Sequence, residues 1–219
     1  ENMDTIPVLT SILAGYFMGN LMASYLVTKW VMGFDIRKHG TGNAGGSNSF
    51  MIMGWKNGLI VGIVDVLKAF LAVYIIRILY PNHQDLSMLM VISGSMAVIG
   101  HIYPFFMGFK GGKGMACFMG MCLGINPEIG FYCILFVIIT TIITDYVAVG
   151  SIIAYIVLPV LLIFSPELIF GSIESYNIFT VFAASFASAI GIWKHRNNIS
   201  NILNREETGL KEVLKKHSK

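Results

Sequence analysis

Three polar stretches contain the residues of this chain that could do chemistry. Residues 38–48 begin with Lys38 and His39 and continue as a glycine-dense segment. Residues 108–114 place two lysines among four glycines. Residues 193–199 include the donor-capable side chains of His195, Arg196 and Asn198, which lie within four residues of one another. Because all three stretches offer positive charge or hydrogen-bond donors, they favour an anionic ligand.

The glycines of the first two stretches leave the backbone open to such a ligand. Successive N–H groups without neighbouring Cβ atoms can converge on a phosphate, and a helix after Gly114 would add the positive end of its dipole. The second stretch is not a nucleotide-binding P-loop, because Gly114 stands where that motif has Ser or Thr. A basic loop that touches lipid headgroups is the alternative, but two glycine-rich loops on one face favour a ligand site.

Composition places these stretches on a membrane protein. Of the 219 residues, 55% are hydrophobic and 12% charged, and the mean hydropathy is +0.71, which is far more apolar than a typical soluble domain. The apolar runs are continuous, which favours helices over alternating membrane strands. The fourth run is short for a span, so five or six crossings remain possible beside seven. The runs cover residues 6–32, 57–79, 87–107, 114–125, 128–144, 147–164 and 177–193.

The charges predict the orientation of this all-α bundle. With seven spans, thirteen of the fifteen basic residues, all except Lys68 and Arg77, fall on one face. The positive-inside rule makes that face cytoplasmic, with the N-terminus outside and the C-terminus inside. A signal peptide is not expected, because no basic segment precedes the first run. We predict one membrane-embedded domain over residues 1–219, in which 199–219 form a basic, amphipathic cytoplasmic tail.

Some polar and small residues within the apolar runs have structural explanations. Asp65 and Lys68 share one helical face, which predicts a buried ion pair, with direct substrate contact as the alternative. Gly15 and Gly19 predict close helix packing. The three cysteines lie in or beside apolar runs, as packed free thiols do, and no metal-ligand spacing is present. No metal or other cofactor is therefore expected.

Together, the three stretches resemble motifs of the PlsY family of bacterial membrane acyltransferases. Residues 40–48 (GTGNAGGSN) resemble the family's GSGNxGATN, residues 109–114 match its FKGGKG, and residues 195–198 (HRNN) resemble its HREN. Residues 100–104 fit its GHxYP. The chain departs from the family at Thr41, Gly46, Ser47 and Asn197, and at Met51, where the family has arginine. Loss of that cation predicts weaker phosphate binding unless Lys56 or another basic residue substitutes.

The resemblance implies a multi-pass enzyme of the bacterial inner membrane with a site that faces the cytoplasm. Such an enzyme moves a fatty acyl chain from acyl phosphate to a hydroxyl of glycerol 3-phosphate. The products are lysophosphatidic acid and phosphate, in the first acylation of phospholipid synthesis. Its partners are these two substrates and membrane lipid, and nucleic acid is not among them. The alternatives are a different alcohol acceptor, or a lipid-phosphate binding protein or transporter without chemistry.

The motifs also assign candidate residues. We expect Thr41, Lys113, His195 and Asn198 to be catalytic, with the general base open between His195 and the phosphate of the acyl donor. From sequence alone, Ser151 most simply satisfies the backbone of its own helix, but its position in the resemblance also makes it a candidate ligand. The expected substrate-binding residues are Gly42, Asn43, Gly45, Ser47, Asn48, Lys110, Gly111, Gly112, Gly114, Ser151 and Arg196.

Overall fold

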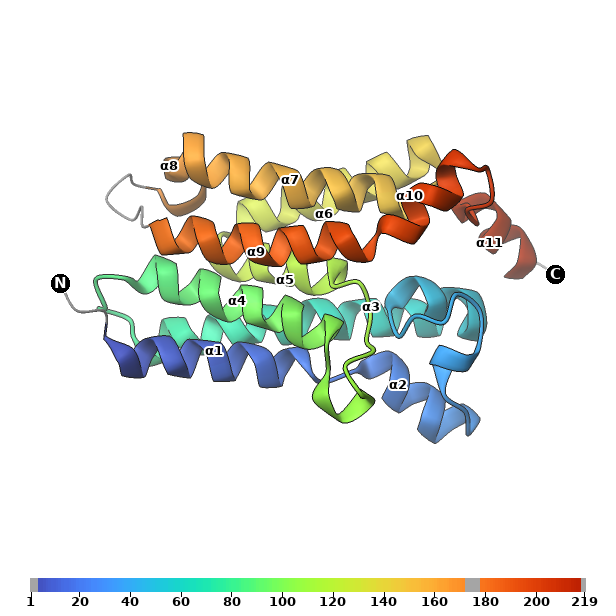
Figure 1. Cartoon of the computed structure of the whole chain (residues 1–219), viewed down its shortest axis with the longest axis horizontal. Helices are drawn as coiled ribbons and strands as arrows, with labels where there is room; N and C mark the ends of the chain where they lie inside the picture. The colour runs from blue at the N-terminus through green and yellow to red at the C-terminus, as the bar shows by residue number, and fades with distance from the viewer. Residues whose placement is uncertain (1–3, 172–177, 218–219) are drawn as a thin grey trace.

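The computed structural model describes residues 4–171 and 178–217, and in these ranges the chain is helical, without a strand. Long helices lie side by side along the long axis of the molecule, and the two chain ends lie at opposite ends of it (Figure 1). The long helices are α1 (Thr5–Gly19), α3 (Gly46–Leu79), α4 (Leu86–Ile102), α5 (Met115–Ile125), α6 (Pro127–Thr144), α7 (Val147–Phe164) and α9 (Ile178–Lys194). The short ones are α2 (Ala23–Val27), α8 (Pro166–Phe170), α10 (Arg196–Leu203) and α11 (Leu210–His217).

Five segments of the described ranges are long and apolar enough to cross a membrane, and a sixth results if α9 and α10, bent by 43°, are counted together. Helix α5 has only 11 residues, in line with the short fourth run. It ends before Asn126, whose side chain caps α6 by accepting hydrogen bonds from the N–H groups of Glu128 and Ile129. The five segments are Thr5–Trp30, Gly46–Leu79, Leu86–Met107, Pro127–Thr144 and Val147–Phe164.

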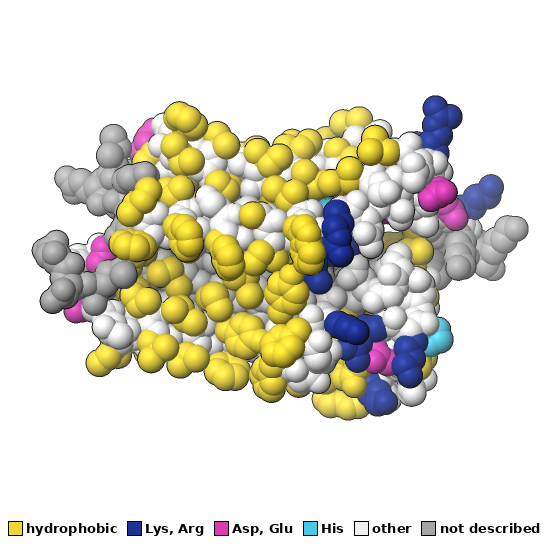
Figure 2. Space-filling view, in the orientation of Figure 1, with side chains coloured by type: hydrophobic (Ala, Val, Ile, Leu, Met, Phe, Trp, Pro, Cys, Tyr) yellow, Lys and Arg dark blue, Asp and Glu magenta, His cyan; other side chains and the backbone are white. Residues whose placement is uncertain are grey.

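The outer surface of the bundle is apolar along most of its length. In Figure 2, hydrophobic side chains cover the bundle, whereas Lys and Arg gather at the end that holds α10 and α11. Large side chains far from that end, such as Phe164 and Phe182, are exposed by 76% and 69%. Such a continuous exposed apolar surface is typical of a protein embedded in lipid. The predicted all-α membrane fold is confirmed, with five or six candidate spans.

The continuous hydropathy of the first apolar run suggested one helix, but the structure divides this run into separate helices. Helix α1 ends at Gly19, and α2 begins only at Ala23. Asn20 stabilises the break, because its Nδ2 donates to the Tyr16 carbonyl (2.6 Å) and its Oδ1 accepts from the Phe105 N–H (2.9 Å). The break leaves backbone groups without helical partners, and the carbonyl of Leu21 accepts a hydrogen bond from Lys68.

Helix α3 begins earlier than the second apolar run and folds back on itself. Its backbone leaves the helical region at Gly54 (φ 82°, ψ 170°), where glycine alone avoids strain. A Cβ on Gly58 would lie 2.6 Å from the Phe50 Cα, so the segment before Gly54 packs directly on the segment after it. The short first segment therefore returns the glycine-rich residues 38–48 to the polar end of the bundle.

The described part of the C-terminal tail, whose pattern of apolar and charged residues also suggested a single surface helix, forms two short helices. Helix α10 ends at Leu203, and Arg205 takes a left-handed conformation (φ 62°). The N–H groups of Leu210 and Lys211 then donate to the Asp145 carbonyl (2.8 Å) and carboxylate (2.9 Å) at the turn between α6 and α7. Helix α11 packs against α3. These contacts hold the tail across the polar end of the bundle.

Glycines set the spacing between the helices of the core. A Cβ on Gly15 would lie 2.1 Å from the Ser93 carbonyl oxygen of α4, and one on Gly19 would lie 2.2 Å from that of Ala97. Gly120 of α5 packs against α3 in the same way, because a Cβ on it would lie 2.0 Å from the Val66 carbonyl oxygen. The predicted packing role of Gly15 and Gly19 is confirmed.

A methyl group at the contact between α1 and α4 should destabilise the protein. We expect Gly19→Ala to cost about 1–3 kcal/mol, as overpacking does, and to lower the thermal midpoint by roughly 2–10 °C. Gly62→Ala is the matched control, because a Cβ at Gly62 would meet no atom within 4 Å. Equal midpoints for the two variants in detergent would contradict this account of the packing.

Candidate active site

The three polar stretches meet at the end of the bundle that carries the tail. They enclose a pocket of about 340 Å³. Six of the expected site residues line it, together with four that were not expected. The expected ones are Thr41, Gly42, Asn43, Lys113, Arg196 and Asn198, and the additional ones are Lys194, Asn197, Asn201 and Glu207.

The other expected residues lie outside the lining of this pocket. Among them, the side chains of His195, Ser151 and Asn48 are buried. The Ser151 hydroxyl donates to the Val147 carbonyl one turn earlier (2.8 Å), which confirms the simpler backbone role, and its place as a ligand stays a prediction. Lys110 and Ser47 are exposed. The lining also leaves out Gly45, Asn48, Gly111, Gly112 and Gly114.

A chain of hydrogen bonds fixes Lys113 at the pocket. Its ammonium donates to Asn198 Oδ1, and Asn198 Nδ2 donates to Glu207 Oε1 (2.5 Å). Glu207 also accepts from Asn201 Nδ2 (3.2 Å), and all of these groups belong to the lining. Because Nδ2 of Asn198 is held by the carboxylate, its carbonyl oxygen must face Lys113. Glu207 therefore sets the orientation of the amide that holds the lysine.

Burial and the neighbouring carboxylate of Glu207 also change the pKa of Lys113. Burial lowers the pKa of Lys113 below its ordinary value, and the carboxylate of Glu207 opposes that shift. The Lys113 backbone is anchored separately, since its carbonyl accepts from the hydroxyl of Tyr155 (3.1 Å). Tyr155 is fully buried between Phe118 and His195, with ring centroids 4.6 and 6.1 Å away.

Asn48 organises the first glycine stretch from below. It is 1% exposed, and its Oδ1 accepts from the Thr41 N–H (2.9 Å). Its Nδ2 is within hydrogen-bond distance of the carbonyls of Ile36 (3.3 Å), His39 (3.0 Å) and Asn43 (2.9 Å). These bonds use its amide within the protein, so Asn48 shapes the loop that presents residues 41–43.

The glycines of the second stretch have a different use from the one expected. The N–H of Gly111 donates to the Ile102 carbonyl and that of Gly112 to the His101 carbonyl, each at 3.1 Å. These donors are therefore engaged with the end of α4 and do not point at a ligand. A Cβ on Gly112 would lie 2.1 Å from His101 Nε2. The two glycines are needed for this close approach, and Lys113 is the residue of the stretch that lines the pocket.

His195 lies at the bend between α9 and α10 and is 3% exposed. Its Nδ1 lies 2.8 Å from the Gly191 carbonyl, so Nδ1 carries the proton in that hydrogen bond. In the neutral imidazole, the free lone pair is then on Nε2. The ring is held against Tyr155 and cannot turn freely, which suits a fixed base or acceptor.

The positive charge of the pocket comes from Lys113, Lys194 and Arg196. Lys194 Nζ lies 4.8 Å from the Tyr103 ring centroid, and the Arg196 guanidinium lies 4.0 Å from that of Trp193. Met51 lines a separate pocket of about 60 Å³ with three residues of the tail. Lys56 lies over the ring of Trp55 and outside both pockets, so it does not replace the family arginine there.

Comparisons with known proteins agree with this geometry. Residues 9–205 match the model of the glycerol-3-phosphate acyltransferase family. The chain belongs to this family. It is 35% identical to the glycerol-3-phosphate acyltransferase of Chlorobaculum tepidum and 34% identical to that of Chlorobaculum parvum, each over 92% of this chain and 96% of the relative.

Solved structures of the family share the fold. One is PlsY, an integral membrane glycerol 3-phosphate acyltransferase, in its glycerol 3-phosphate form, with a TM-score of 0.79 and 29% identity over 93% of this chain and 95% of that one. Its lysophosphatidic acid form gives a TM-score of 0.76 and 30% identity over 94% of this chain and 98% of that one. The resemblance to the PlsY family that the motifs indicated is thereby confirmed.

Asn48→Asp should loosen the glycine loop. The carboxylate keeps an acceptor for Thr41 but loses the donor and faces three carbonyl oxygens, which should cost about 1–3 kcal/mol and lower the thermal midpoint. Asn57→Asp is the matched control, because Asn57 is an exposed asparagine of the same helix. A midpoint for Asn48→Asp as high as that of the control would show that the loop does not depend on this side chain.

Proposed function

We propose that this chain transfers a fatty acyl group from acyl phosphate to glycerol 3-phosphate and releases lysophosphatidic acid and phosphate. The observation that carries the proposal is the pocket in which Lys113 and Asn198 meet residues 41–43, because it joins all three motif stretches at one polar end. Membership of the family supports the reaction type. The glycerol 3-phosphate and lysophosphatidic acid forms of PlsY support the acceptor and the product.

The proposed chemistry is a direct attack without an acyl-enzyme. The acceptor hydroxyl oxygen bonds to the acyl carbonyl carbon, the bond from that carbon to the phosphate oxygen breaks, and phosphate leaves with the electron pair. Acyl phosphate is already activated, so the protein has chiefly to position two anions and stabilise charge at the carbonyl. Lys113, Lys194 and Arg196 neutralise the phosphates. The hydroxyl proton passes to His195 Nε2 or to the phosphate of the donor.

We further propose seven crossings, with α5 as a short membrane-embedded helix and α9 as the last span. In this arrangement the pocket faces the cytoplasm of a bacterial cell and the N-terminus lies outside. The concentration of Lys and Arg at the pocket end supports this orientation by the positive-inside rule. It also places the pocket where soluble glycerol 3-phosphate is made and where an acyl chain can lie in the membrane.

The first test is activity. Purified protein supplied with palmitoyl phosphate should release phosphate only when glycerol 3-phosphate is added, and lysophosphatidic acid should accumulate. Lys113→Ala should lower the rate on the order of 100-fold or more, as removal of one transition-state charge partner does. Lys29→Ala, an exposed lysine outside the pocket, should keep the parental rate.

Three results would each contradict part of the proposal. Absence of acceptor-dependent release, with Lys113→Ala indistinguishable from the parent, would leave a lipid-phosphate binding protein or transporter as the function. Release with another phosphorylated alcohol, but not with glycerol 3-phosphate, would identify a different acceptor. An acyl group trapped on Ser47, Ser151 or Cys117 would replace direct attack by an acyl-enzyme.

The pH dependence of the reaction should report on Glu207. Lys113 must be protonated to neutralise a phosphate, so activity is lost as pH rises through its pKa. Glu207→Gln removes the carboxylate that raises this pKa, so the alkaline loss of activity should begin at a lower pH than in the parent. Glu206→Gln, the exposed neighbouring carboxylate, should leave the profile unchanged. Identical profiles for both variants would mean that Glu207 does not act on Lys113.

A further inference from the structure

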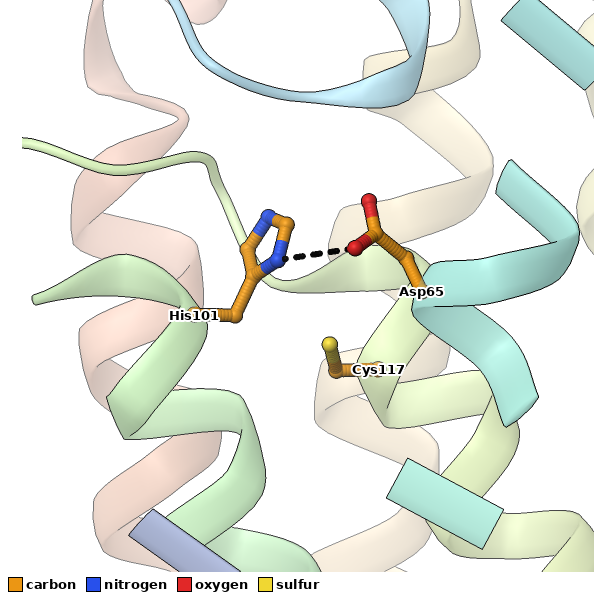
Figure 3. Close-up of side chains that lie close together, drawn as sticks. All are labelled: Asp65, His101 and Cys117. Atoms are coloured by element: carbon orange, nitrogen blue, oxygen red, sulfur yellow. Dashed lines mark ion pairs between the residues drawn. The ribbon is translucent and has the colours of Figure 1, made fainter. Parts of the chain in front are cut away.

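A second group of ionisable side chains is buried inside the bundle, outside the lining of the pocket. Figure 3 shows Asp65 of α3, His101 of α4 and Cys117 of α5 directed toward one another, and their ligand atoms lie within 4.8 Å of each other. Lys68, one turn from Asp65, completes the cluster. Asp65, Lys68, His101 and Cys117 are at most 3% exposed. None of them lines the candidate active site.

The ammonium of Lys68 is the centre of this cluster. Its Nζ lies 2.8 Å from Asp65 Oδ1 and 2.9 Å from His101 Nδ1, and it donates to the Leu21 carbonyl at the break after α1 (2.7 Å). Two of these contacts, to His101 and to Leu21, are hydrogen bonds, and the contact with Asp65 is an ion pair. The same nitrogen of His101 lies 3.5 Å from Asp65 Oδ1, the ion pair drawn in Figure 3. The ammonium and the carboxylate thus hold the ring between them.

The same arrangement argues against a metal ion at this point. Carboxylate, imidazole and thiol groups could together bind a divalent cation. The Lys68 ammonium already lies within 2.9 Å of both the Asp65 and the His101 ligand atoms, and a second cation would be repelled at this distance. The cation of the cluster is therefore Lys68 itself.

His101 connects the cluster to the active site through the second glycine stretch. The His101 carbonyl accepts a hydrogen bond from the Gly112 N–H (3.1 Å). The His101 ring is so close to Gly112 that a Cβ on this glycine would lie only 2.1 Å from Nε2. The next residue is Lys113, whose ammonium lines the pocket. A shift of the His101 ring toward the loop would therefore displace Gly112 and the backbone of Lys113.

We propose that Asp65, Lys68 and His101 are positioning residues that hold Lys113 in place through Gly112. The ion pair orients His101, and His101 supports the loop at Gly112. The expected effect on catalysis rests on the proposed acyl transfer. The expected effect on the conformation of residues 108–114 does not depend on it. An ion pair that only joined helices would affect stability alone. The positioning role predicts in addition that variants of the cluster fold but misplace Lys113.

The experiment uses a double variant, Asp65→Leu/Lys68→Met. Removing both charges avoids a lone buried ion, and replacement of a buried pair by apolar residues is often tolerated. His101→Gln is a second variant that keeps the ion pair and removes the ring. The control is Ser93→Ala, which deletes the hydrogen bond between Ser93 of α4 and the Ala72 carbonyl of α3 (2.9 Å) and does not touch the cluster.

Two measurements are made on each folded variant in detergent. Hydrogen–deuterium exchange of peptides covering residues 108–114 reports the loop without any activity, because the Gly111 and Gly112 N–H groups are bonded to α4. We expect faster exchange there in both cluster variants and not in Ser93→Ala. The KM for glycerol 3-phosphate should rise on the order of tenfold, since small misplacements of a binding group have large effects.

The outcomes separate the two proposals. Parental exchange of residues 108–114 in the cluster variants would overturn the positioning role, and so would faster exchange with an unchanged KM. If the parent protein shows no acyl transfer, the proposed function fails. Exchange alone then decides whether the cluster holds the loop, with faster exchange supporting the proposal and parental exchange refuting it.

Discussion

The contact between the end of α4 and the second glycine stretch is the constraint on which the polar end of the molecule depends. Two N–H groups of the stretch are bonded to the last carbonyls of α4, and Gly112 leaves no space between the chain and the His101 ring. This contact fixes where α5 begins and where Lys113 projects. Its glycines are therefore required by packing, although their motif resembles an anion-binding loop.

Buried polar groups connect this contact to the rest of the bundle. In an apolar interior each of them must find a partner within the protein. The break after α1 supplies the Leu21 carbonyl to Lys68, and Lys68 in turn holds His101. On the pocket side, Tyr155 holds the Lys113 carbonyl, and Glu207 of the tail holds Asn198. The lysine is thus supported by groups from distant parts of the chain.

Much of the fold was predictable because hydropathy and charge are local properties. Continuous apolar runs predicted the helices, the short fourth run predicted α5, and Gly15 and Gly19 predicted a close helix contact. The breaks at residues 20–22 and at Gly54 were not predicted. The first depends on a partner far along the chain, the Phe105 N–H that donates to Asn20. The second depends on the close packing of Gly58 on the Phe50 backbone across the turn, which hydropathy does not record.

The sequence by itself determined the chemical class of the site and its motif residues, since Lys113, Asn198 and residues 41–43 could be read from residue types in order. Only the tertiary structure decided which of them share one pocket, that Asn48, Gly111 and Gly112 serve the backbone, and that Glu207 belongs beside Asn198. Nothing local marks Glu207, a glutamate in a basic tail, because its role arises only when the tail docks on Asp145 and lies across the pocket. The physical reason is that a hydrogen bond depends on distance and direction in space, which residue order does not record for groups separated by many turns of helix.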